Sequence, residues 1–253
     1  MGDVTANMAA AAAAIAELVS AGAEIVVLPE LMTSGYMFGD RDEARAVALG
    51  VDAREFSSWT AAAGDAVVIG GFCELGTDGL IYNSALVIDG GAVIAHYRKT
   101  HLWDREKLIF APGSQRPPVL HTRHGVIAVM ICYDLEFAEL TRQVALQGAE
   151  LIAAPVNWPV MRTPAGEHPG EVITAMSTAR TNRVAVAVCD RAGGERGQEW
   201  AQATVIIDAD GWVVASAGPG PGIAVAEVDL AATHDKKITE NVDLFADRRP
   251  ELY

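Results

Sequence analysis

The amino-acid sequence predicts one large α/β domain in which strands and helices alternate. Three observations lead to this fold class. The chain has 253 residues, a length that α/β folds often reach without splitting into two domains. Short apolar runs that end in glycine, proline or polar residues recur along it, and helical stretches separate several of them. No Ser/Gly/Pro-rich linker interrupts the pattern, so we expect a single domain over residues 1–253, with a C-terminal tail from about residue 239.

The expected elements follow in chain order. The apolar runs that suit buried strands are Glu24–Leu28, Ala66–Phe72, Asn83–Ile88, Val126–Ile131, Glu150–Ala154, Val184–Val188 and Thr204–Asp208. The helical stretches are Val4–Ser20, Asp42–Ala63, Phe137–Gln147 and Glu171–Asn182. Val87–Tyr97 is typical of a β-hairpin that turns at Asp89-Gly90-Gly91, because glycine adopts positive φ easily. A similar pattern recurs at Thr204–Ala215.

Composition excludes several classes of partner. The chain carries 19 basic and 33 acidic residues, a net charge of −14, and has no Lys/Arg cluster to bind a phosphate backbone, so we expect no nucleic acid partner. Three cysteines lie far apart without a CxxC pair, which indicates reduced thiols in a cytoplasmic protein. The Ala-rich segment Met8–Ala23 contains Glu17, lacks a basic flank and is too short to cross a bilayer, so we interpret it as an amphipathic helix and expect no membrane association.

Cys132 is a candidate nucleophile. It lies where an expected strand, ending at Ile131, meets an expected helix that Asp134 is placed to cap. The N-terminus of a helix lowers the pKa of a thiol and also binds a developing oxyanion. The alternative is a buried structural cysteine, because free cysteine is among the most buried residue types.

Glu30 and Lys99 are candidate acid–base groups. Glu30 follows the apolar run EIVVLP, and functional groups often gather where strands of α/β sheets end. Lys99 lies in HYRKTHLWDREKLIFAPG, a run that mixes aromatic and charged residues as the wall of a polar pocket does. Taken singly, Glu30 is more often a solvated or helix-capping acid and Lys99 is more often a solvated surface charge.

Three segments together resemble the signature motifs of the nitrilase, or carbon–nitrogen hydrolase, superfamily. They are VVLPELMTSGY around Glu30, YRKTHLWDREKLIFAPG around Lys99 and MICYDLEFAELTR around Cys132, in the family's order. The similarity continues through APVNWP, DADGWVVA and the closing ADRRPELY, so it covers nearly the whole chain. The resemblance implies a four-layer α-β-β-α sandwich with the active site between two sheets, and a homodimer or higher homo-oligomer braced by the tail.

The resemblance also implies a role for each site residue. Cys132 is expected to attack the substrate, Glu30 to act as general base, Lys99 to stabilise the oxyanion and Glu106 to position the other groups. Substrate-binding positions are expected at Tyr133, Asn157 and Trp158. Such chemistry needs no metal and no organic cofactor, and the six histidines form neither HExxH nor another paired-His metal motif.

The chain departs from the family pattern at two places. Relatives usually begin with a strand before the segment Gly2–Asn7, so either the start given is cut short or another element replaces that strand. Arg191 follows Asp190 where relatives often carry Asn-Arg, and it either lines the pocket or pairs with a nearby acid.

The expected function is hydrolysis of the C–N bond in a small linear amide or N-carbamoyl compound through a cysteine acyl-enzyme. Cys132-Tyr133-Asp134 resembles amide-cleaving branches, whereas nitrile-cleaving branches typically carry Cys-Trp-Glu. A nitrilase and a non-catalytic scaffold with the same fold are the alternatives.

Overall fold

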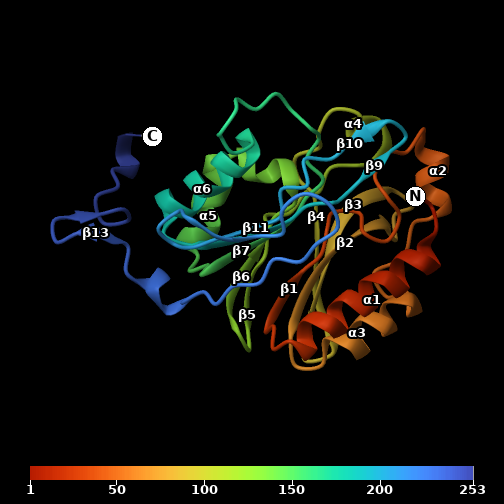
Figure 1. The fold of residues 1–253 in the computed structure, drawn as a ribbon, viewed down its shortest axis with the longest axis horizontal. Coiled ribbons are helices and arrows are strands. Elements are labelled where there is room, and N and C mark those ends of the chain that lie inside the picture. The colour runs from red at the N-terminus through yellow and green to blue at the C-terminus, as the bar shows by residue number, and fades with distance from the viewer. Residues whose placement is uncertain (253) are drawn as a thin grey trace.

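The computed structural model describes residues 1–252, and most of its strands lie in two sheets (Figure 1). The four-stranded sheet has the order β1 (Ile25–Val27), β2 (Val67–Leu75), β3 (Ile81–Asp89) and β4 (Ala92–Arg98). The six-stranded sheet has the order β12 (Val213–Ser216), β11 (Val205–Ile207), β8 (Ala185–Cys189), β7 (Leu151–Pro155), β6 (Gly125–Val129) and β5 (Val119–Thr122). The predicted α/β class and both predicted hairpins, β3–β4 and β11–β12, are confirmed.

Helices α1 (Val4–Ser20) and α3 (Ser57–Ala63) lie side by side against the four-stranded sheet (Figure 1). The predicted bounds of α1 are confirmed. Its buried residues Met8, Ala11 and Ile15 are three and four positions apart, which places them on one helical face. The Asp3 carboxylate accepts a hydrogen bond from the Ala6 N–H and so caps the first turn. This face packs with Trp59 and the neighbouring strands in one apolar cluster.

Helices α5 (Ala138–Leu146) and α6 (Gly170–Asn182) lie together on the other side of the molecule, against the six-stranded sheet (Figure 1). The main apolar cluster joins them to β6, β7 and β8, whose residues are apolar in unbroken runs. That pattern suits β6, β7 and β8, because they pair in parallel and are covered on both faces. The same cluster contains Val67 and Ile69 of β2 and Val87 of β3, so the two sheets pack against each other.

The predicted helix Asp42–Ala63 is wrong as one element. The segment forms α2 (Arg41–Ala46), a short 3₁₀ helix η1 (Arg54–Phe56) and α3. Between α2 and η1, the Leu49 N–H donates to the Cys73 carbonyl and the Leu75 N–H donates to the Leu49 carbonyl, both at 2.9 Å. These contacts with β2, together with the low helix propensity of Gly50, outweigh the local helical pattern.

The C-terminal tail extends away from the body of the molecule, as Figure 1 shows at β13. After a 3₁₀ helix η3 (Ala231–His234), the strands β13 (Lys237–Thr239) and β14 (Val242–Asp243) form a small antiparallel hairpin. A last 3₁₀ helix, η4, covers Pro250–Leu252. Across residues 1–252, no helix is long and apolar enough to cross a membrane.

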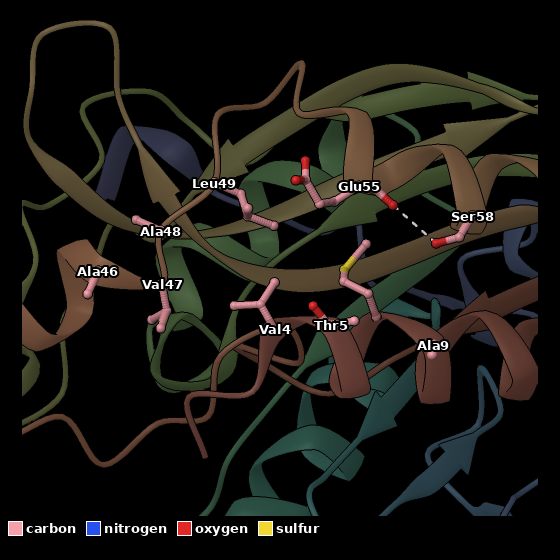
Figure 2. A pocket seen from close by; sticks show the side chains of 10 residues that line it. Val4, Thr5, Ala9, Ala46, Val47, Ala48, Leu49, Glu55 and Ser58 are labelled. Carbon is pink, nitrogen blue, oxygen red and sulfur yellow. Dashed lines mark hydrogen bonds between the residues drawn. The ribbon is translucent and has the colours of Figure 1, made fainter.

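An open groove of about 470 Å³ lies between α1, the segment 46–49 and the start of α3 (Figure 2). Its lining is mostly apolar and consists of Val4, Thr5, Met8, Ala9, Ala46, Val47, Ala48, Leu49, Glu55 and Ser58. The Ser58 hydroxyl donates to the Glu55 carbonyl at its edge. Because this lining includes no predicted catalytic residue, the groove is separate from the candidate site.

Candidate active site

The predicted catalytic residues come from both sheets, at points where strands end. Glu30 follows β1, Lys99 follows β4, and Cys132 follows β6. Glu106 begins the short helix α4 (Glu106–Ile109), and Cys132 begins the 3₁₀ helix η2 (Cys132–Glu136). All four side chains are buried. The fold therefore draws together residues that are far apart in the sequence.

Glu30, Lys99 and Glu106 form one hydrogen-bonded network. The Lys99 Nζ donates to Glu30 Oε1 at 2.7 Å and to Glu106 Oε1 at 2.9 Å. Asn83 of β3 bridges the same two oxygens, since its Nδ2 donates to them at 2.7 and 3.0 Å. The second oxygen of Glu106 accepts from the Trp103 N–H at 2.7 Å. The second oxygen of Glu30 has no hydrogen-bond partner within residues 1–252, which leaves it available to accept a proton.

The electrostatics of this network suit proton transfer. Burial raises the pKa of Glu30 to about 7, against the lowering effect of the Lys99 charge. Burial lowers the pKa of Lys99, but the carboxylates Glu106 and Glu30 outweigh burial and hold it well above its ordinary value. Lys99 is therefore a permanent cation at neutral pH. The raised pKa of Glu30 lies near neutral pH, where a carboxyl can both accept and return a proton.

The backbone at Cys132 is strained. Its φ is +47°, which is uncommon for any residue other than glycine and occurs at functional turns. The Sγ is placed to donate to the Asn157 carbonyl, 3.9 Å away. Strain of this kind persists only where surrounding contacts hold it.

The sequence-based expectation of a lowered thiol pKa at Cys132 is wrong. Burial raises the pKa of Cys132 well above its ordinary value, and the charges of Glu30 and Glu106 raise it further against the effect of Lys99. The helix that follows is a single 3₁₀ segment of five residues, and α5 starts only at Ala138. The resting group is therefore a thiol, and it needs a base to become a nucleophile.

Asp134 holds the turn that carries Cys132. Its buried carboxylate accepts from the Ile131 N–H at 3.1 Å, the Tyr97 hydroxyl at 2.9 Å and the His101 N–H at 3.0 Å. The His101 Nδ1 lies 2.8 Å from the same carboxylate. Asp134 thus ties the turn that carries Cys132 to the segment after Lys99, instead of capping α5.

The predicted substrate-binding residues differ in accessibility. The Tyr133 ring is half-buried and makes edge contacts with Trp103 and Phe137. The Asn157 side chain is buried and already engaged, because its Nδ2 donates to the Glu30 carbonyl at 3.3 Å and its Oδ1 accepts from Arg191. Trp158 is buried in the main apolar cluster. Direct contact with a substrate is therefore most accessible to Tyr133.

Two residues of the site were not predicted from the sequence. Asn83 bridges the two glutamates, and the one available signal was a buried amide in a mostly apolar strand. Tyr36 lies near the network, since burial and then the charges of Glu106 and Glu30 raise the pKa of its hydroxyl well above the ordinary value. Within residues 1–252, no group of three or more His, Cys, Asp or Glu side chains is arranged to hold a metal ion.

A glycine permits the close approach of β2 to the loop that carries Glu30. A Cβ at Gly71 would lie 2.4 Å from the Leu31 nitrogen and 2.6 Å from the Glu30 Cα. No rearrangement of a flexible side chain could relieve that clash, because the atoms belong to the backbone. Leu31 itself has a φ of +48°, so this loop, like the turn at Cys132, is strained.

Comparison with known proteins places these features in a family. Residues 1–237 match the model of the carbon-nitrogen hydrolase family. The chain is 34% identical over 252 residues to a nitrilase from Pyrococcus abyssi, covering 98% of this chain and 92% of the relative. It is 32% identical over 238 residues to the 2-oxoglutaramate amidase of Bacillus subtilis, covering 91% and 87%.

A solved structure agrees with the sequence matches. It is a mutant of the amidase from Nesterenkonia sp. AN1, with the product of Michael addition of acrylamide at its active-site cysteine. The two folds superpose with a TM-score of 0.79 at 26% identity, covering 99% of this chain and 92% of the amidase. The resemblance seen in the three motifs is thus confirmed, and the chain belongs to the carbon–nitrogen hydrolase family of the nitrilase superfamily.

Proposed function

We propose that this protein hydrolyses the C–N bond of a small linear amide or N-carbamoyl compound, with Cys132 as nucleophile. The observation that carries the proposal is the buried Glu30–Lys99 pair, whose charges act on the Cys132 thiol and whose glutamate keeps one oxygen unpartnered. A structural cysteine in a core has no need of a buried base and a buried cation beside it, because burying two charges is costly.

Acylation needs a base, an oxyanion site and an acid. Glu30 takes the thiol proton as the Cys132 sulfur bonds to the carbonyl carbon, and the C=O electron pair moves onto oxygen. Lys99 and the Tyr133 backbone N–H stabilise that oxyanion, at a few kcal/mol for each well-placed donor. Glu30 then gives its proton to the nitrogen, the C–N bond breaks, and ammonia or an amine leaves a thioester on Cys132.

Deacylation reuses the same groups. Glu30 takes a proton from water as the water oxygen attacks the thioester carbon, and the acid product leaves when the C–S bond breaks. The Cys132 sulfur recovers a proton from Glu30, which restores the starting state. Glu106 accepts from Lys99, and Asn83 donates to both Glu30 and Glu106, so their role is to hold the cation and the base in place.

An amide is favoured over a nitrile as the substrate. The relatives include a 2-oxoglutaramate amidase and an amidase that carries an acrylamide adduct on its active-site cysteine, and Cys132-Tyr133-Asp134 resembles the amide-cleaving branches. The relative from Pyrococcus abyssi is named a nitrilase, so nitrile hydrolysis stands as the second candidate.

Ammonia release measured across simple amides, ω-amides, N-carbamoyl compounds and nitriles tests this function, with Cys132→Ala as the control. We expect turnover on an amide or N-carbamoyl class that the control lacks. Turnover of nitriles alone would favour the second candidate. No turnover at all, together with a reactive Cys132, would favour a non-catalytic scaffold.

We also propose a four-layer α-β-β-α arrangement in one domain, because each sheet has its own helix pair and one apolar cluster joins the two sheets.

We infer a homodimer, and the projecting hairpin β13–β14 supports a tail that braces a partner (Figure 1). The last residue of that tail, Tyr253, lies outside the described residues. The three described cysteines are free thiols, which suits a cytoplasmic protein.

Light scattering tests the assembly. We expect the full chain at micromolar concentration to have twice the monomer mass of 26.7 kDa, and a version that ends at Thr239 to lose part of the dimer. A monomeric full chain would contradict the dimer. An unchanged dimer after truncation would contradict only the role of the tail.

A further inference from the structure

The loop that carries Glu30 is held by a side chain from the other sheet. Arg191 follows β8 and is mostly buried. Its Nη2 donates to two successive backbone carbonyls, those of Glu30 at 2.9 Å and Leu31 at 3.0 Å. Since Leu31 has a positive φ, this double contact lies at the strained point of the loop.

The remaining donors of Arg191 extend the same contact. Its Nε donates to Asn157 Oδ1 at 3.0 Å, and the Asn157 amide in turn donates to the Glu30 carbonyl. Its Nη1 donates to Glu195 Oε1 at 2.9 Å, in the short strand β9 (Gly194–Glu195). Every nitrogen of the guanidinium group is therefore committed to the Glu30 loop or to residues that bind it.

Glu195 holds the other end of the loop. Its Oε2 accepts from the backbone N–H groups of Tyr36 at 2.8 Å and Met37 at 3.1 Å. Arg191 and Glu195 thus bind the two ends of the loop, at residues 30–31 and 36–37. They are also bonded to each other. Their side chains are only 16% and 9% exposed, so solvent does little to weaken these contacts.

We propose that Arg191, supported by Glu195, is a positioning residue that fixes the carboxylate of Glu30 against Lys99 and Cys132. The inference deepens the proposed function, on which it rests, because it explains how the base keeps its place. The proposed role requires arginine in particular at position 191. A planar fork with several donors can bind two carbonyls, an amide oxygen and a carboxylate at once, whereas the single ammonium of lysine cannot.

Arg191 also acts through its charge. Burial lowers the pKa of Arg191, while the charges of Glu195 and Glu30 oppose that effect. The attraction between Arg191 and Glu30 is mutual, so the guanidinium favours the carboxylate form of Glu30, which is the form that accepts a proton. Removing the charge would raise the pKa of Glu30 and move the acidic limb of the activity profile to higher pH.

The test compares Arg191→Met and Arg191→Lys with a matched control, Arg196→Met. Arg196 lies in the same segment and pairs with Glu43, but its side chain is 50% exposed and contacts no catalytic group. For Arg191→Met we expect kcat about 100-fold lower with KM nearly unchanged, because a small displacement of a catalytic group has that cost. We expect its acidic limb to move to higher pH.

Arg191→Lys separates the two effects. It should restore the position of the acidic limb, since it keeps the charge, but recover little of kcat, since it loses the fork. Arg196→Met should match the unchanged protein in kcat and in pH profile. Glu195→Gln supplies a milder variant, expected about 10-fold lower in kcat, in case Arg191→Met does not fold.

Alkylation of Cys132 by iodoacetamide gives a readout that needs no substrate. If Glu30 takes the thiol proton, Arg191→Met should slow alkylation at pH 7 by about 10-fold or more, and Arg196→Met should not. If amide turnover is absent but alkylation slows as expected, the proposed function fails and the positioning role stands. Unchanged kcat, pH profile and alkylation in folded Arg191→Met and Glu195→Gln would overturn the inference.

Discussion

The two sheets supply the candidate site with parts that are held in different ways. The four-stranded side contributes Glu30, Asn83 and Lys99, whose side chains are fully buried and bonded to one another. The six-stranded side contributes Cys132, whose thiol has one weak contact and whose backbone is strained. In the first part the functional groups bond to one another, whereas in the second the thiol bonds to no other catalytic side chain and its place depends on the turn that carries it.

Substitutions in the two parts should therefore differ in their effects on the stability of the fold and on turnover. Removing Lys99 from the charged network leaves two buried carboxylates without their cation, which should weaken both folding and turnover. Replacing the thiol removes the reaction centre but breaks no strong contact, so it should abolish turnover and leave the fold nearly unchanged. The variants below test whether the two parts behave so differently.

The largest effect is expected at Cys132. Cys132→Ala and Cys132→Ser should lower kcat to background, a loss on the order of 10⁶-fold, as when a hydrolase loses its nucleophile. Their circular dichroism and unfolding midpoints should stay close to those of the unchanged protein. Retained turnover in the Ala variant would reject Cys132 as nucleophile.

Cys73 and Cys189 provide the matched comparison for labelling. Burial raises the pKa of each to about 12, and the pKa of Cys132 is raised too, so resting acidity does not single out the nucleophile. A neighbouring base does distinguish the nucleophile from the other cysteines. We therefore expect iodoacetamide to label Cys132 first. Equal labelling of all three cysteines in peptide mapping would count against Glu30 as the base.

The next effect is expected in the charged network, where two variants should differ in kind. Glu30→Gln and Lys99→Met should each lower kcat by about 100-fold or more, through loss of the base and of the oxyanion donor. Only Lys99→Met leaves two buried carboxylates without their cation, so only it should also lower the free energy of unfolding, by about 3–5 kcal/mol. Glu106→Gln should impair turnover as well.

Urea unfolding and steady-state kinetics on the same preparations distinguish these outcomes. Equal destabilisation by Glu30→Gln and Lys99→Met would mean that the network is not held by the Lys99 charge. A normal kcat in either variant would break the proposed assignment of base and cation.

Helices and strands could be predicted from the sequence where the interactions that form them connect residues close together in the chain. The bounds of α1 were predictable because the features that form it are local: the structure shows a cap at Asp3 and a buried face at Met8, Ala11 and Ile15. The expected helix Asp42–Ala63 failed because Leu49 pairs with β2, a contact that no local pattern reports. Strand positions were predicted to within a few residues, because an apolar run that suits burial is a local signal in the sequence.

The residues of the candidate site also differ in whether the sequence could predict them. Glu30, Lys99, Glu106 and Cys132 were predicted because each lies in a recognisable motif. Asn83 contacts Glu30 across 53 residues of sequence and lies in no such motif. Arg191 was expected either to line the pocket or to pair with a nearby acid. It pairs with Glu195, but its contact with the Glu30 carbonyl across 161 residues was not predicted. The positive φ at Cys132 is likewise not indicated by any local pattern in the sequence. Tertiary contacts of this kind need coordinates.

A smaller effect is expected from pH, where activity and stability should change in opposite directions. Burial raises the pKa of Glu30 from 4.5 to about 7 in the folded protein. The base must be a carboxylate, so kcat/KM should rise as pH increases through about 7. Because the folded pKa is the higher one, the stabilising contribution of protonated Glu30 is complete below about pH 4.5 and is lost as pH rises through about 7.

Glu30→Gln provides the control for this prediction, because it cannot titrate. Its free energy of unfolding should fall less steeply between pH 4.5 and 7 than that of the unchanged protein. A slope of the same sign should persist, since burial also raises the pKa of Asp190 to about 6. Identical slopes in the two proteins would mean that Glu30 has an ordinary pKa.

The smallest effect is expected at Tyr97→Phe, which probes how the nucleophile turn is held. The Tyr97 hydroxyl donates to Asp134 at 2.9 Å, but the same carboxylate keeps the Ile131 N–H, the His101 N–H and the His101 ring as partners. Losing one of several donors should lower the free energy of unfolding by about 1 kcal/mol and kcat by less than about 10-fold. The ring remains in the core, so no cavity forms. If the backbone alone holds Cys132, kcat in this variant will equal that of the unchanged protein; if Asp134 depends chiefly on Tyr97, kcat will fall as far as in Lys99→Met. Only an intermediate value supports a turn held jointly by its backbone and by Asp134.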